Sequence, residues 1–178
     1  MESILEQREI PYNQVVFTHV NKTPQLFKRA TKYAKKGGRI DLTTGIRPPE
    51  RPTTLKPSIA LKHYLNEGAP LEHITFSSDG NTGRLLTNGV IDYTRVGTPL
   101  EEFRDCVTKE GIPLSYALST ITSNAADRLG IANQHGRLRE GFCANLALFS
   151  KDLELTDLMA GGHWLLRDGV ADKLDPFE

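Results

Sequence analysis

The chain has no long apolar run, no excess of charge of either sign and only two cysteines. No apolar stretch approaches the roughly 20 residues that a membrane-spanning helix needs, and the polar residues 1–9 do not resemble a secretion signal. Basic and acidic side chains number 22 each, which predicts neither a nucleic-acid nor a membrane partner. Cys106 and Cys143 form no CxxC pair, so we expect free thiols in a cytoplasmic protein.

Strand-like and helix-like segments alternate along the first eighty residues. At 178 residues the chain can form a domain with its own core, but it is shorter than the roughly 250 residues of a complete (β/α)8 barrel. We predict strands over 14–20, 39–44 and 74–79, and helices over 24–36 and 57–67. This alternation predicts an α/β fold with a parallel sheet and right-handed crossovers.

Two of the predicted strands end in side chains that carry chemistry. Residues 15–19 (VVFTH) end in His19, and residues 73–81 (HITFSSDGN) contain Asp79 directly after a β-rich run. Functional groups of β/α enzymes lie at the carboxyl ends of such strands, and imidazole and carboxylate suit a zinc site or a water-activating site beside one. Each residue also has a structural interpretation: His19 as a hydrogen-bonded histidine, Asp79 as a cap of the following turn.

The second half of the chain changes character. Residues 80–97 are rich in glycine and asparagine and predict a long loop. Thr98 to Glu101 reads as a capping box that opens a helix ending near Glu110, and a second helix is predicted over 114–129. Beyond Gly130, glycine turns separate short predicted strands over 136–138, 144–149 and 163–167, which is typical of a small β-domain.

Four stretches resemble the amidohydrolase superfamily and, within it, the isoaspartyl (β-aspartyl) dipeptidases. They are residues 17–22 (FTHVNK), 36–43 (KGGRIDLT), 75–81 (TFSSDGN) and the tail 136–169. The SSDGN motif beside THVN is the specific part, whereas the tail alone indicates only the superfamily. The resemblance implies the C-terminal part of a metallo-dependent-hydrolase (β/α)8, or TIM, barrel in residues 1–133. Part of a small β-domain would then follow in residues 134–178.

The resemblance also implies a chemistry and a set of residues. The family uses two zinc ions and a bridging hydroxide that attacks the isopeptide carbonyl. His19 matches a metal-ligating histidine after strand six, and Asp79 matches the strand-eight aspartate that binds metal and acts as the catalytic proton shuttle. Lys22 stands where the family has an arginine that holds the substrate's α-carboxylate. Gly83 replaces a family serine, and Thr82 offers a substrate-binding hydroxyl one position earlier.

The remaining family ligands belong to earlier strands of the barrel, so we expect this chain to hold only the C-terminal part of the site. The resemblance implies a zinc-dependent hydrolase (a metalloprotease-type dipeptidase) that cleaves β-aspartyl dipeptides, and we expect the 178-residue chain to be inactive alone. One alternative is an inactive or complementing fragment that pairs with a separate N-terminal half or forms a homo-oligomer. Another is a different amidohydrolase specificity, either N-acyl-amino-acid deacetylation or dihydroorotase-like ring opening.

Overall fold

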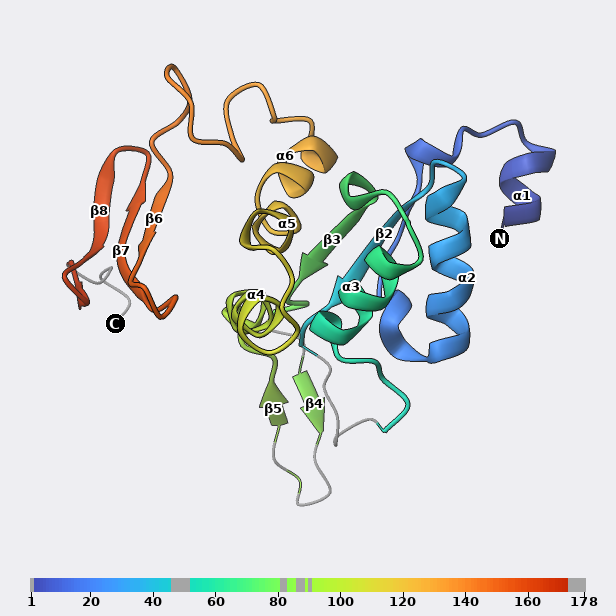
Figure 1. Cartoon of the computed structure of the whole chain (residues 1–178), viewed down its shortest axis with the longest axis horizontal. Helices are drawn as coiled ribbons and strands as arrows, with labels where there is room; N and C mark the ends of the chain where they lie inside the picture. The colour runs from blue at the N-terminus through green and yellow to red at the C-terminus, as the bar shows by residue number, and fades with distance from the viewer. Residues whose placement is uncertain (1, 46–51, 81–82, 86–88, 90, 173–178) are drawn as a thin grey trace. The chain divides into compact units, whose positions relative to one another are not determined.

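The computed structural model describes residues 2–45, 52–80, 83–85, 89 and 91–172 (Figure 1). The chain divides into two compact units, Met1–Ala125 and Ala126–Glu178. The division of the sequence into a barrel part over 1–133 and a β-domain part over 134–178 stays a prediction. Within the described residues, no helix is both long and apolar enough to cross a membrane.

The first unit is built on a three-stranded parallel sheet. Its strands are β1 (Val16–Phe17), β2 (Arg39–Thr43) and β3 (Ile74–Ser77), and they lie side by side in that order. Helix α2 (Pro24–Lys35) connects β1 to β2, and α3 (Pro57–Asn66) connects β2 to β3 (Figure 1). The predicted α/β class, with parallel strands and helical crossovers from a TIM barrel, is therefore confirmed.

Strand β2 separates an apolar face from a polar face. Successive side chains of a strand point to opposite sides, so Ile40 and Leu42 share one face and Asp41 and Thr43 share the other. Phe17, the register partner of Ile40, packs its ring 4.4 Å from that of Tyr33 on α2. The face with Ile40 and Leu42 is therefore the one covered by helix, and both side chains are fully buried.

Strand β1 is shorter than the predicted strand over 14–20. Before it, Tyr12–Gln14 forms the 3-10 helix η1, preceded by α1 (Glu2–Gln7). After it, the left-handed backbone of His19 (φ 58°) turns the chain into the 3-10 helix η2 (Val20–Lys22). Only the central part of the apolar run therefore pairs with β2.

The segment that contains the helices after β3 contacts the outer edge of this strand through one side chain and one backbone carbonyl. These helices are α4 (Thr98–Thr108), α5 (Leu114–Ser119) and α6 (Ser123–Leu129). The buried Asn124 donates from Nδ2 to the carbonyl oxygens of Ile74 at 2.9 Å and of Leu71, in the 3-10 helix η3 (Leu71–His73), at 2.8 Å. The N–H of Phe76 donates to the carbonyl of Thr120 at 3.2 Å.

One local prediction between β3 and α4 is wrong. Part of the loop predicted over 80–97 forms the antiparallel strands β4 (Gly83–Leu85) and β5 (Ile91–Tyr93). The capping box over Thr98 to Glu101 stays a prediction; α4 begins at Thr98, and Glu101 pairs with Arg95. The adjacent Glu102 is fully buried and accepts the N–H of Ser58 at 3.1 Å, so α4 caps the start of α3.

The second unit contains a four-stranded antiparallel sheet in sequence order. Its strands are β6 (Leu146–Phe149), β7 (Leu155–Ala160), β8 (His163–Arg167) and β9 (Val170–Ala171). The strand predicted over 163–167 is present in full as β8, and the one over 144–149 is present in shortened form as β6. The strand predicted over 136–138 is not formed, and β7 was not predicted. Leu148 and Leu165 remain about half exposed, so this sheet is only thinly covered within the described residues.

We expect Asn124→Ala to lower the free energy of unfolding by about 1–3 kcal/mol. The substitution leaves the carbonyls of Leu71 and Ile74 without their donor at a buried position. Urea denaturation monitored by circular dichroism measures the change. Gln25→Ala, at an exposed amide on α2, is the control and should shift stability by no more than about 0.5 kcal/mol. Equal effects of the two substitutions would contradict the bridging role of Asn124.

Candidate functional site

His19 and Asp79 meet at the carboxyl-terminal ends of β1 and β3. Nε2 of His19 lies 3.7 Å from Oδ2 of Asp79, and both side chains are partly exposed. Nδ1 of His19 is buried and has no hydrogen-bond partner in the described part of the chain. The two side chains predicted to share a site therefore lie together, although β2 separates their strands.

Both residues adopt a left-handed backbone conformation. The φ angle is 58° at His19 and 54° at Asp79, a region that costs a non-glycine residue about 1–3 kcal/mol. At His19 this conformation ends the strand and begins η2. Beside Asp79, the N–H of Gly80 donates to Oγ of Ser78 at 3.0 Å. Strain of this kind persists only where surrounding contacts enforce it, and it gathers at functional sites.

Asn21 holds the His19 turn against the end of β2. Its side chain is fully buried and, at 3.0 Å each, donates to the carbonyls of Thr43 and Leu55 and accepts the N–H of Thr43. The N–H of Leu55 returns a bond to the carbonyl of Asn21 at 2.8 Å. These bonds tie η2, β2 and the segment before α3 together two residues from His19.

Asp41 lies on the polar face of β2 and links it to β3. Its buried carboxylate accepts hydrogen bonds from Thr75 Oγ1 at 2.8 Å and Ser77 Oγ at 2.5 Å. Burial raises the pKa of Asp41, against the opposing effect of these two bonds. The charges of His19 and Asp79 also act on this pKa, in opposite directions, which places Asp41 within electrostatic reach of the pair.

Asn21 and Asp41 were not singled out from the sequence as site residues. The available signals were an amide inside the THVN motif and an acid between the two apolar residues of β2. Neither signal identifies a hydrogen-bond partner, because the partners come from other strands. The bonds from Thr75 and Ser77 depend on the register that sets Asp41 beside Thr75 and Thr43 beside Ser77.

The structure locates one of the two predicted substrate-binding residues. Lys22 is half-buried at the end of η2, and its N–H donates to the carbonyl of His19 at 3.2 Å. Its carbonyl accepts Thr53 Oγ1 at 3.3 Å. Thr82 lies outside the described residues. Lys22 therefore belongs to the same turn as His19.

The donor types fit part of a zinc site. Imidazole nitrogen and carboxylate oxygen are ordinary zinc ligands, and the buried Nδ1 of His19 leaves this ring a donor that no described protein group uses. A zinc site takes three or four protein ligands. Among the described residues, no group of three or more His, Cys, Asp or Glu side chains is arranged to hold a metal. If both bound metal, His19 and Asp79 would supply two ligands, fewer than a zinc site takes.

Residues 31–165 match the amidohydrolase family, and the chain belongs to it. The structure is similar to that of the beta-aspartyl dipeptidase from the thermophilic, keratin-degrading Fervidobacterium islandicum AW-1, solved in complex with a beta-Asp-Leu dipeptide. The TM-score is 0.84 with 27% identity, over 98% of this chain and 45% of that chain. The resemblance seen in the sequence motifs is confirmed, and the chain spans less than half of that relative.

More distant structures share the fold alone. An adenosine deaminase from Xanthomonas campestris with bound zinc has a TM-score of 0.60 and 13% identity, over 99% of this chain and 42% of that chain. An N-acetylglucosamine-6-phosphate deacetylase from Pasteurella multocida has a TM-score of 0.51 and 13% identity, over 92% and 59%. These similarities show a shared fold and indicate no substrate.

We expect the free energy of unfolding of the wild type to contain a contribution from Asp41 that falls between about pH 4 and pH 7. Asp41→Asn should remove this pH dependence. The pKa of Asp41 is raised above its ordinary value of 3.8 in the folded state, so its contribution is fully present below that value. The contribution is then lost as the pH rises through the folded pKa, because ionising a buried carboxylate is costly. Urea denaturation at several pH values measures the difference between the two proteins.

Asp105→Asn is the control with the opposite sign. Burial acts to raise the pKa of Asp105, but hydrogen bonds and charges from Lys109 and Lys56 outweigh it and lower the pKa. The stability that Asp105 adds is therefore present above 3.8 and is lost as the pH falls through the folded pKa. The same pH trend for both variants would contradict the assignment for Asp41.

Proposed function

We propose that this chain supplies the His19 and Asp79 part of the active site of a zinc-dependent hydrolase that cleaves β-aspartyl dipeptides. The observation that carries the proposal is the 3.7 Å approach of the His19 imidazole to the Asp79 carboxylate, with both residues in strained conformations after parallel strands. The similarity to a beta-aspartyl dipeptidase solved with beta-Asp-Leu supports the choice of substrate class. Among the family's specificities, this is the one that the motifs and the structural similarity favour together.

Asp79 is proposed as the group that moves the proton. Zinc, when bound, supplies a Lewis acid that activates water and polarises the scissile carbonyl. The Asp79 carboxylate accepts a proton from the attacking water as the new C–O bond forms. It then returns this proton to the leaving nitrogen as the C–N bond breaks, which releases a carboxylic acid and an amine. His19 contributes a neutral imidazole nitrogen as a ligand and holds its position beside Asp79.

Substrate orientation is assigned to the turn after β1. The Lys22 ammonium provides a positive charge for the α-carboxylate of the dipeptide, as a point charge without the bidentate geometry of arginine. Thr82, outside the described residues, is proposed to add a hydroxyl contact. Because Lys22 lies in the same turn as His19, the contacts of Asn21 hold both residues in place.

The remainder of the site would come from outside these 178 residues. The full family site uses two zinc ions, and the described residues offer two ligands. We therefore propose that the chain acts as a complementing fragment, with a polypeptide carrying the other strands or within a homo-oligomer, and is inactive alone. N-acyl-amino-acid deacetylation and dihydroorotase-like ring opening are the competing reactions. The free cysteines, buried Cys106 and exposed Cys143, fit a cytoplasmic setting.

We expect no hydrolysis of β-Asp-Leu by the 178-residue chain with added zinc. Activity should appear when the chain is co-expressed with the part of the Fervidobacterium enzyme that it does not cover. Asp79→Asn should then lower kcat by about a hundredfold or more, the usual loss when a general acid–base group is removed. Amino-acid release measures the rate, and N-acyl amino acids and dihydroorotate test the competing reactions.

Asp127→Asn is the matched control for that loss. Its side chain is 38% exposed, against 37% for Asp79, and it pairs with Arg137 in the second unit. This variant should keep the wild-type rate. Equal losses in both variants, or hydrolysis by the chain alone, would contradict the assigned roles.

Zinc content provides a test that does not depend on turnover. We expect less than one tightly bound zinc per isolated chain, because two ligands hold the ion weakly. The co-expressed assembly should bind zinc, and His19→Ala combined with Asp79→Asn should remove it. Elemental analysis after dialysis measures the metal, and His163→Ala in the second unit is the control. Unchanged zinc in the double variant would place the metal elsewhere.

A further inference from the structure

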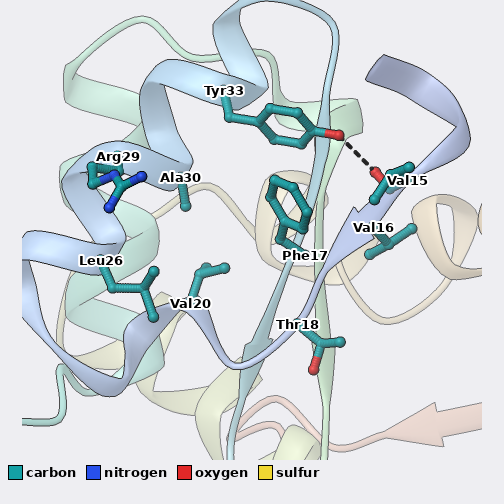
Figure 2. A pocket seen from close by; sticks show the side chains of 9 residues that line it. All are labelled: Val15, Val16, Phe17, Thr18, Val20, Leu26, Arg29, Ala30 and Tyr33. Carbon is teal, nitrogen blue, oxygen red and sulfur yellow. Dashed lines mark hydrogen bonds between the residues drawn. The ribbon is translucent and has the colours of Figure 1, made fainter. Parts of the chain in front are cut away.

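The two faces of the three-stranded sheet differ in chemistry. On the helix-bearing face, a pocket of about 660 Å³ between β1 and α2 has a mostly apolar lining (Figure 2). The ring of Phe17 lies beside that of Tyr33 there, and the Tyr33 hydroxyl donates to the Val15 carbonyl at 3.1 Å. The opposite face of β2 carries the buried carboxylate of Asp41. This acid therefore lies apart from the apolar packing that holds the helix on the sheet.

The carboxylate of Asp41 is held by two neutral hydroxyl groups. Its Oδ1 accepts Thr75 Oγ1 at 2.8 Å, and its Oδ2 accepts Ser77 Oγ at 2.5 Å. Burying a carboxylate costs free energy, and burial raises the pKa of Asp41 despite these two bonds. Apolar groups of the same shape can replace a buried hydrogen-bonded pair with little change in stability. The acid therefore indicates a role beyond the stability of the sheet.

Ser77 connects this acid to the candidate site. It lies two residues before Asp79, and its Oγ is the one that donates to Asp41. Its carbonyl oxygen accepts the N–H of Thr44 at 2.8 Å and Thr44 Oγ1 at 3.0 Å. Oγ1 of Thr44 in turn lies 2.7 Å from Oγ1 of Thr98, at the start of α4. Both the side chain and the carbonyl of Ser77 are therefore fixed.

The other side of the Asp79 turn is fixed by close backbone contacts. The N–H of Gly80 donates to Oγ of Ser78 at 3.0 Å. A Cβ at position 45 would lie 2.3 Å from the Ser78 carbonyl oxygen, so the chain after β2 approaches this peptide as only glycine allows. Asp79, with its left-handed backbone, therefore lies between two fixed points, Ser77 and Gly80.

We propose that Asp41 is a positioning residue that holds the Asp79 carboxylate in place for proton transfer, acting through Ser77. Without the bond from Ser77, the last peptide of β3 can rotate and carry the Asp79 carboxylate away from His19. A displacement of about 1 Å at a reacting group can cost about a hundredfold in rate. This inference rests on the proposed function, because it concerns the group that moves the proton there.

Nuclear magnetic resonance of the full 178-residue chain without metal tests the positioning directly. In the wild type, the backbone chemical shifts of Asp79 should report the left-handed conformation, and nuclear Overhauser effects should join Asp79 to the His19 ring. Ser77→Ala should move these shifts toward those of an unconstrained chain and remove the contact. Ser77→Thr keeps the hydroxyl group and should restore both signals.

Ser119→Ala is the matched control. Ser119 on α5 is half-buried, as Ser77 is, and its hydroxyl donates to the Tyr116 carbonyl at 2.8 Å. This variant should leave the signals of Asp79 and His19 unchanged, while urea denaturation measures the stability of each protein. A purely structural bond would lower the stability of Ser77→Ala without moving the Asp79 signals, and that result overturns the proposal.

Kinetics provide the second measurement, on the co-expressed assembly that hydrolyses β-Asp-Leu. Ser77→Ala should lower kcat about tenfold or more at unchanged KM, whereas Ser119→Ala should change neither. Asp41→Ala combined with Ser77→Ala should lose no more than Asp41→Ala alone, because the two residues act as a unit. Additive losses contradict the proposal. If Asp41→Ala does not fold, the Ser77 variants decide.

The positioning role and the proposed function fail separately. Displacement of Asp79 in Ser77→Ala, together with no hydrolysis by the assembly, supports the positioning and contradicts the reaction. Hydrolysis that Asp79→Asn abolishes and Ser77→Ala leaves unchanged supports the reaction and contradicts the positioning.

Discussion

The register between β2 and β3 is the constraint on which the rest of the first unit depends. It sets Asp41 beside Thr75 and Thr43 beside Ser77, so that one face of the pair carries a buried carboxylate with two hydroxyl donors. A shift by one residue would place Ile40 and Leu42 on that polar face and Asp41 against the helices. The same register brings Thr44 N–H to the Ser77 carbonyl at 2.8 Å, which aligns the strand ends where Asp79 begins its turn.

The strain at the site is balanced by contacts on either side of it. His19 and Asp79 both have positive φ angles, which are unfavourable for residues other than glycine. Asn21 holds the first turn through its bonds to Thr43 and Leu55, while Ser78 holds the second through Gly80. The fold thus stabilises two unfavourable turns whose common result is the approach of imidazole and carboxylate. A purely structural turn would not require that both side chains point to one place.

The ends of the strands could be predicted from the sequence, because runs of apolar and β-branched residues indicate strands. The carboxyl ends of parallel strands lie at the same edge of the sheet. This reasoning brought His19 and Asp79 together correctly. It missed Asn21 and Asp41, whose partners lie 22 to 36 positions away and are chosen by the register. It also gave no indication that Glu101 pairs with Arg95 or that Glu102 accepts the N–H of Ser58 on α3. Local patterns predict elements, whereas long-range hydrogen bonds depend on the packed fold.

The two edges of the three-stranded sheet differ among the described residues, and the difference bears on the pair formed by His19 and Asp79. An isolated βαβ layer that had adapted to stand alone would protect both edges, as Asn124 and Thr120 protect β3. Strand β1 instead keeps an open edge beside an apolar pocket, on the same strand that ends in His19. The open edge and the candidate site therefore share one strand, because β1 leads directly into the turn that holds His19.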